Sequence, residues 1–219
     1  INSLYGARLY IPDDTLWFTN NRIVNNSNSA TSLSVFAYFS TSTTPIIVKN
    51  NFISSKSSNA DIYLYSPNYV HVINNTIYNE ASYNNYLIRV SNGPYPSVNN
   101  YIINNVFKAD HANNFFSSDT NFNSISYSNN CYYAASMGMF YSSSNSPSYT
   151  FFSDWNSSGV DTNSYFLNTS FHSYTDLHTL SSALNNKAIS SPLVKYDIDG
   201  ELRNPSTPDI GADEFDLPS

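Results

Sequence analysis

Basic side chains that could accept a proton are scarce in this sequence and lie far apart along it. The 219 residues include nine Lys and Arg residues and four His residues. Proton abstraction beside a sugar carboxylate needs a basic side chain and a cation that neutralises the carboxylate. The candidates for that chemistry are Lys56, Arg89 and His111. Because Lys56 lies in a Ser-rich stretch, a solvated surface lysine is the simpler interpretation of it.

Acidic residues offer two other kinds of site. Hydrolysis of a glycosidic bond needs two carboxylates at a fixed separation, and Asp13-Asp14 follows a proline in what reads as a turn. Near the C-terminus, Asp197 and Asp199 make up half of a calcium-loop pattern, and the other ligands are missing. The alternative is a tight hairpin turn at Asp199-Gly200. We expect no bound cofactor, with calcium as the minor alternative.

The remaining polar candidates read as structural residues. Asp209 is expected to anchor the C-terminal region by hydrogen bonds, together with Asp213 and with Arg203 as a partner. None of the histidines has the spacing of a metal site, so we expect surface or hydrogen-bonded roles for all of them: His71, His111, His172 and His178.

Aromatic side chains form the most coherent outward-facing surface. Successive residues of a strand point to opposite faces. If Ile62 and Leu64 point inward, Tyr63 and Tyr65 point outward, and Arg89 points outward from the next equivalent strand. Flat rings stack on the C–H faces of sugars, and a guanidinium binds their oxygens bidentately. These three outward residues are a predicted glycan-binding surface, unless the tyrosines only shield a β surface.

The elements that would position these side chains follow a repeated phrase, in which two apolar strands flank a pair of asparagines. Successive pairs are separated by 30, 24, 30 and 25 residues. Strand repeats of this length indicate a solenoid. The five pairs are Asn20-Asn21, Asn50-Asn51, Asn74-Asn75, Asn104-Asn105 and Asn129-Asn130.

The apolar residues change phase at each asparagine pair. Those two positions before and two positions after a pair would face opposite sides of a straight strand. The chain must therefore bend at the pair, and asparagine tolerates the left-handed backbone that such a bend requires. Equivalent asparagines stacked from rung to rung can also form a hydrogen-bonded ladder. We assign that ladder to the first residue of each pair: Asn20, Asn50, Asn74, Asn104 and Asn129.

A third strand lies between successive phrases, as in residues 61–65 and 86–90. Three short strands per turn predict an all-β fold, a right-handed single-stranded parallel β-helix of about five rungs with an irregular C-terminal cap. We place the rungs at residues 1–135. Residues 136–219 are expected to form a capping extension of the same domain, because an uncovered last rung would expose strand edges.

Composition excludes several classes of function. The net charge is −7 and no basic run occurs, which disfavours nucleic acid as a partner. Aromatic residues make up 16% of the chain, whereas disordered proteins contain few of them. No stretch approaches the roughly twenty apolar residues that span a membrane.

The first residue is Ile1 rather than Met, which favours a piece of a longer secreted chain or surface assembly.

The C-terminal residues resemble the signature of secreted bacterial right-handed β-helix repeat proteins, a Bacteroidetes-type group related in fold to pectate lyases. The matching pieces are residues 197–203 (DIDGELR) and 208–215 (PDIGADEF), preceded by 176–178 (DLH) and 191–194 (SPLV). The resemblance implies an extracellular or bacterial cell-surface protein, often one that handles polysaccharide. It departs from the group after Val194, where only Lys195 and Tyr196 precede the next piece.

These observations predict a module that binds or contacts polysaccharide without a catalytic constellation of its own. One alternative is a polysaccharide lyase acting on acidic glycans. Lys56-Ser57 is similar to the Lys-Ser pair that carries the base in alginate and chondroitin lyases of this fold, but their Arg-His phrase is missing. Another alternative is a structural stalk or adhesin segment of a larger surface protein.

Overall fold

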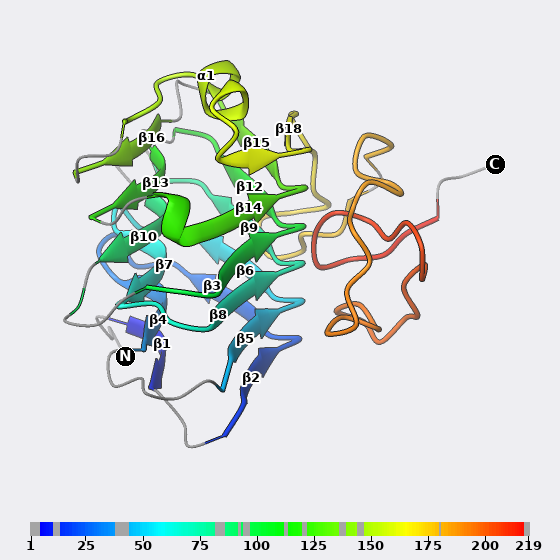
Figure 1. Cartoon of the computed structure of the whole chain (residues 1–219). Coiled ribbons are helices and arrows are strands. Elements are labelled where there is room, and N and C mark those ends of the chain that lie inside the picture. The colour runs from blue at the N-terminus through cyan, green and yellow to red at the C-terminus, as the bar shows by residue number, and fades with distance from the viewer. Residues whose placement is uncertain are drawn as a thin grey trace.

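The computed structural model describes residues 5–10, 14–37, 44–81, 86–91, 93, 97–111, 114–119, 122–135, 139–143, 147–179 and 181–216. Three parallel sheets, here called A, B and C, form the three sides of a β-solenoid (Figure 1). Helix in the described residues is confined to η1 (Phe122–Ser124) and α1 (Phe152–Ser157). Neither of these is long and apolar enough to cross a bilayer. The expected all-β parallel β-helix is confirmed.

Each turn of the chain adds one strand to each sheet, and neighbouring strands pair in parallel. Sheet A contains β1 (Tyr5–Tyr10), β4 (Thr31–Phe36), β7 (Ala60–Tyr65), β10 (Tyr86–Ser91), β13 (Asn114–Ser118) and β16 (Met139–Ser142). Sheet B contains β2 (Leu16–Thr19), β5 (Ile46–Lys49), β8 (Val70–Ile73), β11 (Asn100–Ile103), β14 (Ile125–Ser128) and β17 (Asp161–Thr162). Sheet C contains β3 (Arg22–Asn25), β6 (Phe52–Ser55), β9 (Thr76–Asn79), β12 (Val106–Ala109), β15 (Cys131–Ala134) and β18 (Tyr165–Phe166).

Equivalent inward residues stack on one another along the solenoid. The central column of sheet A is formed, in order, by Leu33, Ile62, Ile88, Phe116 and Phe140, all of them buried. Facing it, sheet C contributes Ile53, Ile77, Phe107 and Tyr132. These two columns are therefore aliphatic in the first rungs and aromatic near the end of the solenoid. Stacked, fully buried side chains of this kind provide the main favourable term in folding.

The chain bends from sheet B into sheet C at the first asparagine of each pair. The backbone φ there lies between 50° and 59°, in the left-handed region, at Asn20, Asn50, Asn74, Asn104 and Asn129. This confirms the bend predicted from the change in apolar phase, because both flanking strands now direct their apolar residues into one interior.

The ladder is formed by the second asparagine of each pair, so our assignment to the first asparagines is wrong. The ladder residues are Asn21, Asn51, Asn75, Asn105 and Asn130, whose Nδ2-to-Oδ1 distances run from 2.8 to 3.1 Å. Each accepting Oδ1 also receives the backbone N–H of the preceding ladder residue. Among the five first asparagines, all of them described, a side-chain hydrogen bond joins one pair, from Asn104 Nδ2 to Asn74 Oδ1 at 3.2 Å. The side chains of the first asparagines point away from the solenoid interior, because each of these residues occupies the left-handed position of the bend itself.

Strand pairing continues beyond residue 135, so the expected boundary of the rungs lies too early. The last strands, β16, β17 and β18, fall within residues 139–166. Helix α1 covers this end of the solenoid, and its Trp155 ring stacks on Phe140 with centroids 4.2 Å apart. The Trp155 indole N–H donates to Asp161 at 2.9 Å, so the buried ring is also satisfied as a hydrogen-bond donor.

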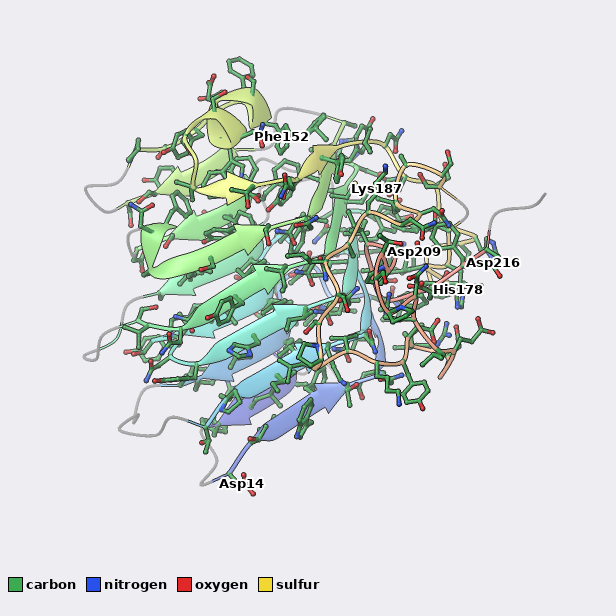
Figure 2. The ribbon with its side chains drawn as sticks, turned by 45° about the vertical axis from the view of Figure 1, so that its right-hand side comes forward. Asp14, Phe152, His178, Lys187, Asp209 and Asp216 are labelled. Atoms are coloured by element: carbon green, nitrogen blue, oxygen red, sulfur yellow. The ribbon has the colours of Figure 1, made fainter. Side chains whose placement is uncertain are left out.

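Residues 167–179 and 181–216, here called the C-terminal segment, run back along the corner between sheets B and C (Figure 1, yellow-orange to red). Figure 2 shows Lys187, Asp209 and His178 on this side of the molecule. The first asparagines of the pairs donate to backbone carbonyls of the segment, namely those of Asp197, Ile198, Tyr196, Asp209, Gly211, Ile189 and Lys187. The segment thus covers a side of the solenoid in addition to the end that α1 closes.

The C-terminal segment also covers apolar residues on the outer face of sheet C. Val106 and Cys131 form a buried cluster with Leu184, Ala188 and Ile210. Phe52 forms a second cluster with Leu177, Ile198 and Ala212. The segment thus removes Val106, Cys131 and Phe52, three outward apolar residues of sheet C, from water.

Candidate functional site

The outer face of sheet A presents aromatic side chains from neighbouring strands. Tyr63 and Tyr65 of β7 are half-buried on this face, between inward residues that are fully buried. The parallel register places Arg89 of β10 beside Tyr63, and Phe36 of β4 beside Tyr65. The structure therefore brings together the three residues that the sequence assigned to a glycan-binding surface.

Four rings form a continuous surface across β1, β4 and β7. Tyr10 stacks on Phe36 with centroids 5.2 Å apart and planes 14° apart. Phe36 lies 6.0 Å from both Tyr63 and Tyr65, which are 6.3 Å from each other. Tyr10 is 51% exposed, so the outer end of the row is open to solvent. We call these rings, together with Arg8 and Arg89, the aromatic face.

Two guanidinium groups lie over rings of the aromatic face. The Cζ atom of Arg8 is 5.9 Å from the Phe36 centroid, and that of Arg89 is 5.8 Å from the Tyr63 centroid. Both arginines are exposed. A guanidinium held over a ring keeps its charge and its planar array of N–H donors, which can bind hydroxyl or carboxylate oxygens.

Sequence reasoning missed half of the aromatic face: Arg8, Tyr10 and Phe36. The same alternation that identified Tyr63 would have found them. Arg8 and Tyr10 flank the inward Leu9, and Phe36 follows the buried Val35. The register that aligns β1 and β4 with β7 was the missing information.

The three candidate catalytic residues have different neighbours and belong to different elements. Lys56 follows β6; its Nζ is 3.0 Å from Glu80 Oε2 and 4.8 Å from the centre of the Tyr174 ring. His111 is exposed after β12, and Arg89 belongs to the aromatic face. An ammonium paired with a carboxylate fits the surface interpretation of Lys56.

Asp13, the first residue of the candidate acid pair, lies outside the described residues, and its neighbour Asp14 is exposed.

Asp197 and Asp199 lie in a turn, as the hairpin alternative predicted. Tyr196 and Leu202 form an antiparallel bridge around it, and Gly200 has φ of 87°. The buried Asp197 Oδ1 accepts backbone N–H groups of Asp199 at 2.9 Å and of Glu201 at 2.8 Å. Its Oδ2 accepts a third such group at 3.1 Å. Asp197 Oδ1 thus holds the turn, whereas Oδ2 ties it to Glu214. Calcium binding there stays a hypothesis.

Buried polar groups also anchor Arg203 and Asp209, which belong to the two pieces of the C-terminal signature, residues 197–203 and 208–215. The Asp209 carboxylate accepts backbone N–H groups of Asn186 and Phe215, which confirms its expected anchoring role. Burial raises the pKa of Asp209 to about 6. Arg203 is 3% exposed, lies 3.2 Å from Glu214 and donates to the Asn50 side chain at 3.2 Å. The signature residues therefore attach the C-terminal segment to the solenoid.

Comparison of the chain with protein-family models, with curated proteins and with solved structures finds no match.

Proposed function

We propose that this chain is an extracellular or cell-surface β-helix module that binds polysaccharide through the aromatic face of sheet A. One observation carries the proposal: four rings, each in contact with at least one other, lie across three neighbouring strands, and two of the rings each have a guanidinium over them. Ring faces and edges attract the C–H groups of sugars, and guanidinium groups attract sugar oxygens.

The direction of the aromatic face suits a linear polymer. Neighbouring strands are roughly 4.8 Å apart, so rings on three strands span on the order of 10 Å along the solenoid axis. A sugar chain that lies across the strands would meet rings from β1, β4 and β7 in turn. Arg8 and Arg89 lie toward the two ends of this row, on β1 and β10.

Composition and the C-terminal signature support the proposed setting. Only 11% of residues are charged, while Asn and Ser together supply about a third of the chain. Such a surface suits neutral polar partners such as glycans. The pieces that resemble secreted bacterial β-helix proteins favour an extracellular or bacterial cell-surface location, within a longer chain or assembly.

Binding to a glycan array, followed by calorimetry on the best ligand, tests the proposal. Tyr63→Ala and Phe36→Ala should each weaken binding by about tenfold, which corresponds to about 1.4 kcal/mol. Tyr101→Ala is the matched control, because Tyr101 is 38% exposed on the outer face of sheet B and contacts His71 there. Equal losses in all three variants would contradict binding at the aromatic face.

The same preparations separate binding from the two alternatives. Elimination creates an ultraviolet-absorbing uronate, so we expect no rise in absorbance with polyuronates or sulfated glycans, with or without calcium. A rise that Lys56→Ala abolishes and Tyr63→Ala does not would replace our proposal with a lyase. A folded protein that binds no glycan on the array would instead favour a structural stalk.

A further inference from the structure

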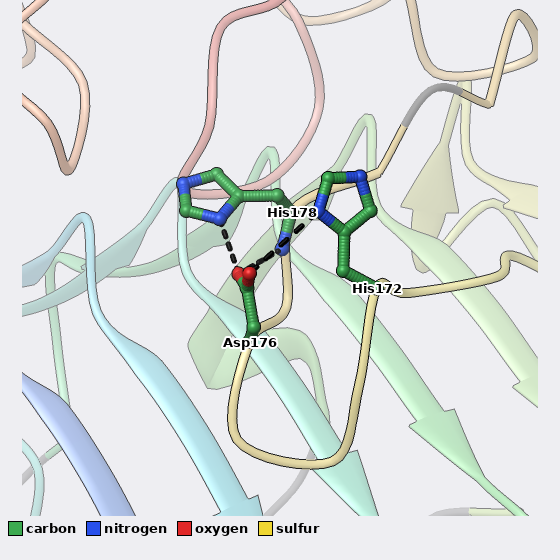
Figure 3. Close-up of side chains that lie close together, drawn as sticks. All are labelled: His172, Asp176 and His178. Atoms are coloured by element: carbon green, nitrogen blue, oxygen red, sulfur yellow. Dashed lines mark hydrogen bonds and ion pairs between the residues drawn. The ribbon is translucent and has the colours of Figure 1, made fainter.

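Two imidazole rings flank a carboxylate in the C-terminal segment, as Figure 3 shows for His172, Asp176 and His178. His172 Nδ1 lies 3.6 Å from Asp176 Oδ2, and His178 Nδ1 contacts Asp176 Oδ1. One donor atom from each of the three residues lies within 4.8 Å of the others. Their spacing along the chain does not predict this cluster, because the three residues come together only through the turn between His172 and His178.

The second ring nitrogen of His178 already has a partner. His178 Nε2 lies 2.6 Å from Asp199 Oδ2, and Asp199 Oδ1 accepts a hydrogen bond from Arg22 of β3 at 2.8 Å. Phe52 packs against the same imidazole edge-to-face, with centroids 5.0 Å apart. A carboxylate on one nitrogen fixes the tautomer and direction of a histidine, as the outer-shell carboxylates of metal-binding histidines do.

We propose that His172, Asp176 and His178 bind one transition-metal ion of the Zn²⁺ class, with Asp199 orienting His178. Two nitrogen donors and one carboxylate suit Zn²⁺ or Co²⁺, whereas Ca²⁺ and Mg²⁺ prefer sites built from oxygen alone. Three protein ligands leave a fourth position for water or an external ligand.

Charge and access both suit a cation at this place. Three carboxylates surround His178, those of Asp176, Asp199 and Asp213, and the last of these lies 3.9 Å from His178 Nε2. Arg22 contacts both Asp176 and Asp199. The side chain of His172 is 57% exposed. An open hollow of about 390 Å³ adjoins it and is lined by Asn168, Ser170, Phe171, His172, Thr179 and Ser181.

A metal bound here would reinforce the attachment of the C-terminal segment. It would close the turn between His172 and His178 and hold His178 against Asp199. Asp199 is bound in turn to Arg22 of the solenoid. Because the metal binds the folded arrangement in preference to the unfolded chain, its binding should raise the melting temperature.

Calorimetry on the full, untagged chain after EDTA treatment and dialysis tests this proposal, with Zn²⁺ and Ca²⁺ as separate probes. We expect one equivalent of Zn²⁺ to bind, a melting temperature higher by several degrees, and no competition from Ca²⁺ for this site. Co²⁺ should give visible absorption bands typical of a four-coordinate site. Failure to bind Zn²⁺, or Ca²⁺ binding as tight as that of Zn²⁺, would overturn the proposal.

Three variants locate the site. His172→Ala removes an exposed ligand and should weaken Zn²⁺ binding at least tenfold, with the thermal shift lost. Asp199→Asn should weaken it by about 10- to 100-fold, the usual cost of losing an outer-shell partner. His111→Ala, which removes an exposed histidine elsewhere, should bind Zn²⁺ like the wild type. Circular dichroism checks that each variant is folded, and equal affinity of His172→Ala and His111→Ala would refute this site.

Discussion

Asp61 is the clearest case of a side chain whose environment changes its chemistry. It is fully buried at the start of β7, where Asn79 Nδ2 lies 3.0 Å from each carboxylate oxygen. Burial raises the pKa of Asp61 to about 7, although the hydrogen bonds from Asn79 and Ser55 act in the opposite direction. At a pH between the ordinary aspartate pKa and about 7, the folded protein therefore keeps a proton on Asp61 that the unfolded chain has lost.

This predicts an unusual dependence of stability on pH. Between about pH 4 and pH 7 the folded state binds more protons at Asp61 than the unfolded state does, so the free energy of unfolding should fall as pH rises. The contribution of this residue is a few kcal/mol and should be largely lost above pH 7. Urea denaturation of the wild type and Asp61→Asn at several pH values measures it.

We expect Asp61→Asn to show a shallower decline in stability than the wild type over that range. Asp154→Asn is the control, because Asp154 is an exposed carboxylate on α1. Equal slopes for the wild type and Asp61→Asn would show that Asp61 does not carry the proton.

At each bend between sheets B and C, the two asparagines of the pair have different structural roles. The first residue provides the left-handed backbone and reaches outward to the C-terminal segment. The second residue lies beneath the bend: Asn105, which is fully buried, donates to the carbonyls of Val72 and Ile103 and to Asn130. Each ladder side chain thus donates to at least one backbone carbonyl of sheet B, in contacts that are buried for Asn75, Asn105 and Asn130.

Removing one ladder residue should destabilise the whole solenoid. Asn105→Ala removes the acceptor of two Asn75 N–H groups and a donor to the buried Val72 carbonyl, which should cost about 1–3 kcal/mol for each group left unsatisfied. Chemical denaturation gives the difference directly. Asn156→Ala, at an exposed position of α1, is the matched control. An unchanged unfolding midpoint for Asn105→Ala would contradict a stabilising ladder.

At the scale of the whole molecule, the approach of the C-terminal segment to the solenoid depends on Gly211. Its φ is 108°, and its N–H donates to the Asn104 carbonyl at 2.9 Å. A Cβ atom at this position would lie 2.9 Å from Thr76 Oγ1 and 3.1 Å from a Val106 methyl group. Glycine is therefore required both for the backbone conformation and for the close contact.

Gly211→Ala should loosen the C-terminal segment, and Cys131 reports the change. Cys131 is 1% exposed, and burial raises the pKa of its thiol to about 12, so a thiol reagent should reach it only when the segment opens. We expect Gly211→Ala to raise the labelling rate at least tenfold. Gly200→Ala is the matched control, because its φ is also positive but a Cβ would meet nothing within 4 Å. Equal labelling in both variants would contradict the role of the close contact.

The repeat, the bends and the faces of individual strands could all be predicted from the amino-acid sequence. These features are local: a strand alternates its side chains with a period of two, and a change of phase within nine residues requires a bend. For this reason the bends at the first asparagines, the parallel β-helix and the outward placement of Tyr63, Tyr65 and Arg89 could all be predicted.

The contacts between rungs, and those between the solenoid and the C-terminal segment, became apparent only in the folded structure. The ladder depends on which asparagine lies beneath the bend, and the aromatic face depends on the register of β1 and β4 with β7. The C-terminal segment binds residues far away in the chain, as Asn20 binds the carbonyl of Asp197 across 177 positions. Such contacts follow from the packing of the whole molecule, because no local period relates positions that far apart.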